Sequence, residues 1–254
     1  MDTQSPLFQA QVVAISGACG GIGRALAHRF AQLGAHLVLL DKSAADLNAL
    51  RQELPDNMVR VCSYDQALST DIERACHDAA AADLFINNAG ITLRAPLVDT
   101  KHHDIHRVVN INITGAIAMA AGIGSAMVQR QGGRIINVTS QFGMIPAPGR
   151  AIYGASKAAL AHFTRSAASE WGAKGVEVMT LAPGPVDTAM LDGLKQSPTA
   201  LQALIDQIPT ARLSSPAQIA DVVVFMAHLP KGLMNGETFL VDGGFSLPYT
   251  LNRV

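Results

Sequence analysis

Short apolar runs along the chain alternate with longer segments in which apolar residues recur every three or four positions. The runs that have the length and composition of buried strands are 12–16, 36–40, 59–62, 84–87, 134–138, 177–181 and 238–241. The intervening segments predict helices at 22–33, 45–53, 71–81, 103–130, 153–172 and 216–228. This alternation predicts an α/β fold with a doubly wound, parallel, seven-stranded sheet that carries helices on both faces.

The length of 254 residues favours a single domain that spans 1–254. The least regular part is 189–213, where apolar residues mix with glycine and proline. A loop of this length in a compact domain is usually functional, so we expect a substrate-binding lid with one or two short helices. After the last strand, 245–254 forms a C-terminal tail whose contribution to an active site stays open.

Composition excludes several classes of function. There are 19 basic and 20 acidic residues, so the chain lacks the basic field that nucleic-acid binding generally requires. The segment 108–129 is uncharged, but its polar and glycine residues favour a buried or subunit-interface helix over a membrane span. No metal site is expected, because the histidines at 102, 103 and 106 lack a fixed acidic or thiolate partner.

Cysteine usage and the start of the chain favour a cytoplasmic location. Cys19, Cys62 and Cys76 are widely spaced and include no C-x-x-C pair, which suits a reducing compartment. Positions 1–11 lack the basic start and apolar stretch of a signal peptide.

A glycine-rich turn, Ser16-Gly17-Ala18-Cys19-Gly20-Gly21-Ile22-Gly23, follows the first strand and opens a helix. Such a turn lets the backbone approach a pyrophosphate, which the helix N-terminus attracts, so we expect a Rossmann-type dinucleotide-binding fold. Asp41 ends the second strand, where a carboxylate accepts hydrogen bonds from ribose hydroxyls and repels a 2′-phosphate. NAD is therefore expected over NADP, although the adjacent Lys42 could pair with a phosphate.

Candidate chemistry lies in the second half of the chain. Tyr153 and Lys157 are four residues apart and share one helix face, where an ammonium would lower the pKa of the phenol toward working pH. Ser140 ends a strand thirteen residues before Tyr153. A tuned phenol beside a hydroxyl can exchange a proton with a carbonyl or alcohol oxygen.

From residue 12 to about 244, these motifs resemble those of the short-chain dehydrogenase/reductase family. The resemblance implies that Tyr153 is the acid/base, that Lys157 stabilises its phenolate and that Ser140 holds the substrate oxygen. It also implies that the amide of Asn112 binds a water in a proton path, and that Asp65 meets the adenine. The cofactor-binding residues so implied are Gly17, Cys19, Gly21, Ile22, Gly23, Asp41, Asp65, Asn88, Ala89, Gly90, Tyr153, Lys157, Pro183, Gly184, Val186 and Thr188.

The resulting prediction is an NAD-dependent oxidoreductase that acts on CH–OH groups and moves a hydride between NAD and a secondary alcohol or ketone, assembled as a homotetramer. Two alternatives stay open: a 3-oxoacyl thioester reductase that uses NADPH, and a non-catalytic nucleotide-sensing protein. Gln141, Arg94 and Arg150 are candidate substrate contacts or surface residues. An arginine suits a hydroxyl-rich or carboxylate-bearing substrate, whereas the apolar lid favours a partly hydrophobic one.

Overall fold

The computed structural model describes residues 7–55 and 58–247. Within these residues, seven strands form one sheet in the order β3-β2-β1-β4-β5-β6-β7, and every neighbouring pair is parallel. The strands are β1 (Val12–Ser16), β2 (His36–Asp41), β3 (Val59–Ser63), β4 (Leu84–Asn87), β5 (Gly133–Val138), β6 (Val176–Pro183) and β7 (Thr238–Val241). The predicted Rossmann-type fold is confirmed.

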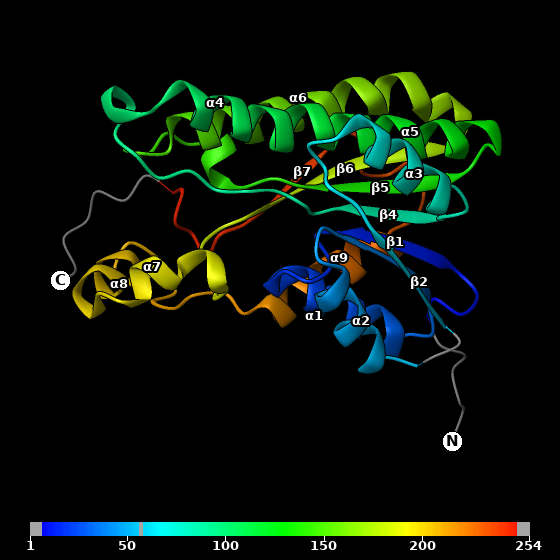
Figure 1. The fold of residues 1–254 in the computed structure, drawn as a ribbon, viewed down its shortest axis with the longest axis horizontal. Coiled ribbons are helices and arrows are strands. Elements are labelled where there is room, and N and C mark those ends of the chain that lie inside the picture. The colour runs from blue at the N-terminus through cyan, green and yellow to red at the C-terminus, as the bar shows by residue number, and fades with distance from the viewer. Residues whose placement is uncertain (1–6, 56–57, 248–254) are drawn as a thin grey trace.

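Helices cover both faces of the sheet (Figure 1). One layer holds α1 (Gly21–Gln32), α2 (Ala44–Gln52) and α9 (Pro216–His228), and the other holds α3 (Ser69–Asp78), α4 (His102–Val109), α5 (Ala116–Gln129) and α6 (Ala151–Trp171). Short 3-10 turns occur at Leu97–Asp99, Gln141–Gly143 and Gly172–Lys174.

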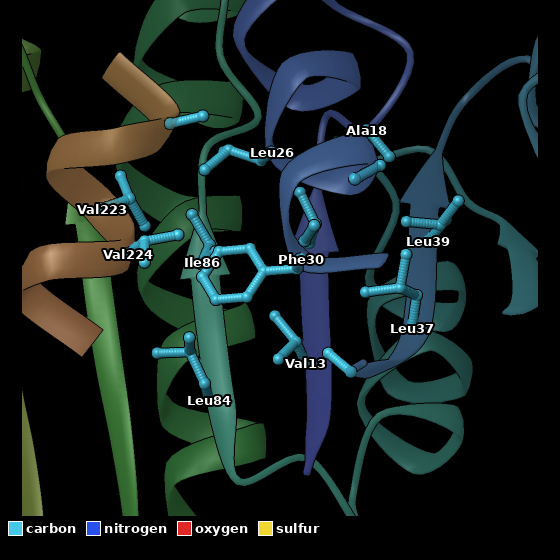
Figure 2. Close-up of a cluster of buried hydrophobic side chains, with 14 of the residues drawn as sticks. Val13, Ala18, Leu26, Phe30, Leu37, Leu39, Leu84, Ile86, Val223 and Val224 are labelled. Carbon is cyan, nitrogen blue, oxygen red and sulfur yellow. The ribbon is translucent and has the colours of Figure 1, made fainter. Parts of the chain in front are cut away.

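Burial on both faces explains why the strands are apolar at consecutive positions. In Figure 2, Val13 of β1 and Ile86 of β4 pack with Phe30 of α1 and Val223 of α9. The next residue of β1, Ala14, belongs to the second core cluster, beneath α3 and α5. Successive residues of a strand point to opposite faces, so both sets must be apolar when both faces are covered.

The helix expected at 103–130 is interrupted. Between α4 and α5, residues Asn110–Gly115 form a π-helical turn, which widens the helix before it continues. Gly115 packs against the loop after β3, where a Cβ atom on Gly115 would lie 2.2 Å from the Gln66 carbonyl oxygen. This close approach depends on a distant residue, which is why helical periodicity alone did not reveal the interruption.

By length and composition alone, the helical stretch His102–Gln129 could cross a membrane. Core helices of soluble proteins meet the same criteria, and the inward side of α5 is buried against the sheet and α3 through Met119, Ile123 and Met127.

The segment predicted as a lid contains a 3-10 turn, Ala189–Leu191, followed by α7 (Asp192–Lys195) and α8 (Pro198–Ile205). These elements, yellow in Figure 1, extend beyond the strand ends and outside both helix layers. Of the predicted tail, positions 248–254 lie outside the described residues.

The strand order reverses between β1 and β4, and ligands of doubly wound sheets bind in the crevice at such a reversal.

Candidate active site

A cavity of about 1440 Å³ lies at the carboxyl ends of the strands. Its wall combines the glycine turn after β1, the ends of β2, β4, β5 and β6, and residues of α7 and α8. It therefore joins the predicted cofactor and catalytic residues in one continuous space. Three predicted site residues, Gly23, Asn112 and Gln141, do not line it.

The glycine turn needs its glycines for backbone geometry. Gly17 has a φ of +64°, and a Cβ atom there would lie 2.9 Å from the Ala89 Cα atom. At Gly23 a Cβ atom would lie 2.0 Å from the Gly17 carbonyl oxygen. Gly23 thus permits the turn to close on α1, while Gly17, Gly21 and the turn between them face the cavity.

Ser16 joins the glycine turn to the segment after β4. Its hydroxyl oxygen accepts hydrogen bonds from the amides of Asn88, at 3.0 Å, and Ala89, at 3.1 Å. The Asn88 side chain in turn donates to the carbonyl oxygens of Ser16 and Gly17, both at 3.1 Å. These bonds place Ala89 and Gly90 at the cavity wall beside the glycine turn.

Where β2 ends at the cavity, the Asp41 carboxylate accepts hydrogen bonds from two backbone amides. One oxygen accepts from the Cys19 amide at 2.8 Å, and the other from the Lys42 amide at 2.7 Å. The Cys19 amide is therefore engaged inside the protein. Burial and the Asp41 charge raise the pKa of the Cys19 thiol to about 12, so it remains neutral.

Lys42 provides a cation at this same end. Its ammonium nitrogen lies 2.6 Å from an Asp65 carboxylate oxygen, and its side chain is 76% exposed. The ion pair with Lys42, together with the amide of Ala67, lowers the pKa of Asp65. Asp41, Lys42 and Asp65 all line the cavity, so both charge signs occur at this end of it.

The described residues fit a dinucleotide. The N-terminus of α1 faces the cavity with no side-chain cap, which leaves amides for a pyrophosphate. A Cβ atom at Gly90 would lie 3.2 Å from both the Asn112 side-chain oxygen and the Lys157 ammonium. Glycine at this position therefore avoids a tight contact at the cavity wall. Pro183, Gly184, Val186 and Thr188 line the same cavity, and Thr188 lies beside Gly21 of the glycine turn.

Tyr153 and Ser140 both line the cavity, and their side chains interact. Burial raises the pKa of Tyr153, against the lowering effects of a hydrogen bond with the Ser140 side chain and of the Arg150 charge. The expectation that Lys157 brings this pKa down toward working pH is therefore wrong for the protein as it stands. The reason is desolvation, which favours the neutral phenol more strongly than the nearby groups favour the phenolate.

Lys157 is buried beneath Tyr153. Its ammonium nitrogen donates to the Val138 carbonyl oxygen at 3.0 Å and lies 5.9 Å from the centre of the Tyr153 ring. Burial lowers the pKa of Lys157 to about 8. At neutral pH this side chain is mostly charged, and it also lines the cavity.

The side chain of Asn112 is engaged entirely within the protein. Its nitrogen donates to the Ile91 carbonyl oxygen at 2.8 Å and to the Ser156 hydroxyl at 3.1 Å, while its oxygen accepts from the Ile91 amide at 2.9 Å. Both N–H groups are used, so a bound water would have to donate to the second lone pair of the side-chain oxygen, and the expected water contact stays a prediction. The π-helical turn directs Asn112 toward Ile91, which it links to α6.

The three candidate substrate residues occupy different places. Arg94 and Arg150 line the cavity on the side of Tyr153. Gln141 is 1% exposed, lies behind the wall near Gly184, and has no hydrogen-bond partner for either side-chain polar atom in the described residues. It therefore does not reach the cavity.

Two residues that position parts of the site were not predicted from the sequence. Ser156 accepts from Asn112 and donates to the Tyr153 carbonyl oxygen at 2.7 Å, which links α6 to the π-helical turn. Gln66 donates to the Ile111 carbonyl oxygen at 2.9 Å and accepts from the Tyr64 hydroxyl at 2.6 Å. Only Ser156 carried a signal, because it lies between Tyr153 and Lys157.

Comparison with known proteins decides the family. Residues 17–246 match a family model described as enoyl-(acyl carrier protein) reductase. The chain belongs to the short-chain dehydrogenase/reductase family. It is accordingly an oxidoreductase that transfers a hydride, with chemistry at CH–OH or keto groups.

Relatives of this family member differ in substrate. The 3-oxoacyl-[acyl-carrier-protein] reductase FabG of Thermotoga maritima is 32% identical and aligns over 93% of this chain and 98% of its own. Galactitol 2-dehydrogenase (L-tagatose-forming) of Cereibacter sphaeroides is 33% identical over 92% of this chain and 94% of its own. The structure of gluconate 5-dehydrogenase from Burkholderia cenocepacia, with NADP and tartrate, is 27% identical, with a TM-score of 0.89 and coverage of 95% and 97%.

The expected preference for NAD over NADP is wrong. The gluconate 5-dehydrogenase structure contains NADP, and a matching structure from Beutenbergia cavernae contains NADP at low occupancy. The geometry gives a physical reason. Asp41 is already bound by two amides and Lys42 places a cation beside it, so a carboxylate at this position does not by itself exclude a 2′-phosphate.

Proposed function

We propose that this chain interconverts a ketone and its secondary alcohol with NADP(H), and that Tyr153 is the acid/base. The observation that carries this proposal is that Tyr153, Ser140 and Lys157 line the same cavity as the glycine turn and Lys42. A cavity of about 1440 Å³ that holds both sets of residues suits a nicotinamide dinucleotide together with a substrate.

Reduction of a ketone follows from the state of these groups. Burial keeps Tyr153 protonated at neutral pH, so its hydroxyl donates a proton to the carbonyl oxygen. The Ser140 oxygen accepts from the Phe142 amide at 3.3 Å, and when substrate is bound its hydroxyl hydrogen turns from Tyr153 to the same carbonyl oxygen. NADPH, when bound, supplies the hydride to the carbonyl carbon.

Lys157 and Asn112 support Tyr153 without being the proton donor. The buried Lys157 ammonium stabilises negative charge that develops on Tyr153 as the proton leaves. Asn112 fixes Ile91, and through Ser156 it fixes the first turns of α6. Oxidation of the alcohol uses the same groups in reverse.

The test is Tyr153→Phe, assayed for oxidation of NADPH with a panel of ketones and for NADPH binding by fluorescence. Loss of the proton donor should lower kcat by about 100-fold or more, with NADPH affinity kept within a few-fold. A variant that retained most of its turnover would contradict the assignment. Wild-type protein that bound NADPH but turned over no ketone would favour the nucleotide-sensing alternative.

A second candidate is reduction of a 3-oxoacyl thioester. It is favoured by the Thermotoga maritima relative and by the apolar lid residues Met190, Leu191 and Leu194, which line the cavity. Turnover of a 3-oxoacyl thioester at least tenfold better than of any small ketone would support it.

We further propose a cytoplasmic homotetramer. All three cysteines are free thiols, which supports a reducing compartment. On α5, the exposed positions Ala121, Gly122 and Ser125 form a small, uncharged face suited to close packing of helices. A monomeric mass in light scattering would exclude the assembly.

A further inference from the structure

All the acidic residues of the cavity wall lie at one end, where Lys42 forms an ion pair with Asp65. The acidic residues in its wall are Asp41, Asp46 and Asp65, which belong to the ends of β2 and β3 and the start of α2. The other charged residues of the wall are basic: Arg107, the buried Lys157 and, on the side of Tyr153, the two arginines Arg94 and Arg150. In the part of the chain that the structure describes, neither arginine is in an ion pair.

Arg150 is held in a fixed position with part of its hydrogen-bonding capacity unused. One terminal nitrogen, Nη1, donates to the Thr92 hydroxyl at 2.6 Å and to the Leu93 carbonyl oxygen at 3.5 Å. The guanidinium carbon lies 5.6 Å from the centre of the Phe142 ring, which forms part of the same wall. Within residues 7–55 and 58–247, Nε and Nη2 have no hydrogen-bond partner.

The backbone brings Arg94 to Arg150. The Ala95 amide donates to the Gly149 carbonyl oxygen at 3.1 Å, which joins the loop after β4 to the loop before α6. Burial and the Arg94 charge both lower the pKa of Arg150, as expected for two cations that face one space. A half-buried cation without a counter-ion costs free energy, which a bound anion recovers.

We infer that the substrate carries a carboxylate, which Arg150 and Arg94 bind while its carbonyl carbon lies at Tyr153 and Ser140. The substrate class is therefore a small oxo acid or hydroxy acid. Arg150 directs the free edge of its guanidinium, Nε and Nη2, to both carboxylate oxygens, and Arg94 contributes from the rim. Arg150 is the N-cap residue of α6, three residues before Tyr153, so one helix end sets the spacing between the anion and the reacting carbon. This inference rests on the proposed function.

The experiment compares oxo acids with their methyl esters. A panel of oxo acids of four to six carbons, each paired with its ester, is assayed with NADPH on the wild-type protein. Removal of the charge should lower kcat/KM by about 10- to 100-fold, mainly through KM, because one charge-assisted pair is lost. Equal use of acid and ester, or a preference for esters or thioesters, would overturn the inference while the proposed function stands. Turnover of no compound would defeat the proposed function and the inference with it.

Two variants assign the effect to the arginines. Arg150→Gln and Arg94→Gln should each lower kcat/KM for the acid about tenfold or more and leave the value for the ester within twofold. Thr92→Val is the matched control, since it removes the loop hydrogen bond of Arg150 but keeps the charge. Arg51→Gln, at an exposed position on α2, controls for net charge. If either arginine variant lowered both substrates equally, or Thr92→Val reproduced the effect on the acid, Arg150 would be a loop tether and the inference would fail.

Discussion

The replacement of Asn112 by alanine should destabilise the protein, because its buried side chain joins the loop after β4 to α6 through hydrogen bonds. The side chain is 0% exposed and makes three hydrogen bonds, two with the Ile91 backbone and one with Ser156. At about 1 kcal/mol for each net hydrogen bond, the loss is about 3 kcal/mol. For a domain of this size, each kcal/mol shifts Tm by about 2–4 °C, so Tm should fall by about 6–12 °C.

The assay is thermal unfolding without nucleotide, followed by circular dichroism. Asn110→Ala is the matched control, since Asn110 lies in the same π-helical turn but is exposed and makes a single side-chain hydrogen bond, to the Ala67 carbonyl oxygen at 3.2 Å. Its Tm should fall by no more than about 3 °C. The reasoning would be refuted if Asn112→Ala unfolded at the wild-type temperature and lost only its turnover, because the side chain would then act in the chemistry and not in the architecture.

Three further predictions concern charged groups. Lys42→Ala should raise KM for NADPH about fivefold and leave KM for NADH nearly unchanged, because the exposed ammonium faces the adenosine end; equal increases would contradict this. Because burial lowers the pKa of Lys157 to about 8, the folded protein binds fewer protons than the unfolded chain between about pH 8 and 10.4, so wild type should gain stability relative to Lys157→Met as pH rises through that window; a Tm difference that stays constant would speak against it. Arg134→Met should cost about 3–5 kcal/mol in urea unfolding, since it leaves Glu177 buried without its partner, and the Arg134→Met/Glu177→Met double variant should recover part of that loss; no recovery would exclude the argument.

The elements could be predicted because they depend on neighbours along the chain. Consecutive apolar residues in β1 and β4 reflect burial on both faces of a parallel sheet, so their positions followed from sequence alone. The same holds for Tyr153 and Lys157, whose spacing places them on one face of α6. Helix ends were less accurate: α3 begins two residues before its expected start and ends three residues early.

The state of the site residues depended on partners far away in sequence. Asp41 is bound by the Cys19 amide 22 residues away, so its carboxylate does not by itself exclude a 2′-phosphate. Asn112 is engaged by Ile91 and Ser156, 21 and 44 residues away. No local pattern carries these contacts, because they form only when the segments after β1, β4 and β5 meet at one edge of the sheet.

The sequence by itself therefore determined the fold, the glycine turn and the order of the catalytic residues, all of which rest on local spacing. Tertiary structure decided that Tyr153 is held neutral by burial, that the helix before α5 widens at Asn112, and that Arg150 faces the cavity beside Arg94. The physical reason is that desolvation and competition for hydrogen bonds are set by which distant groups share a space, whereas periodicity is set within a few residues.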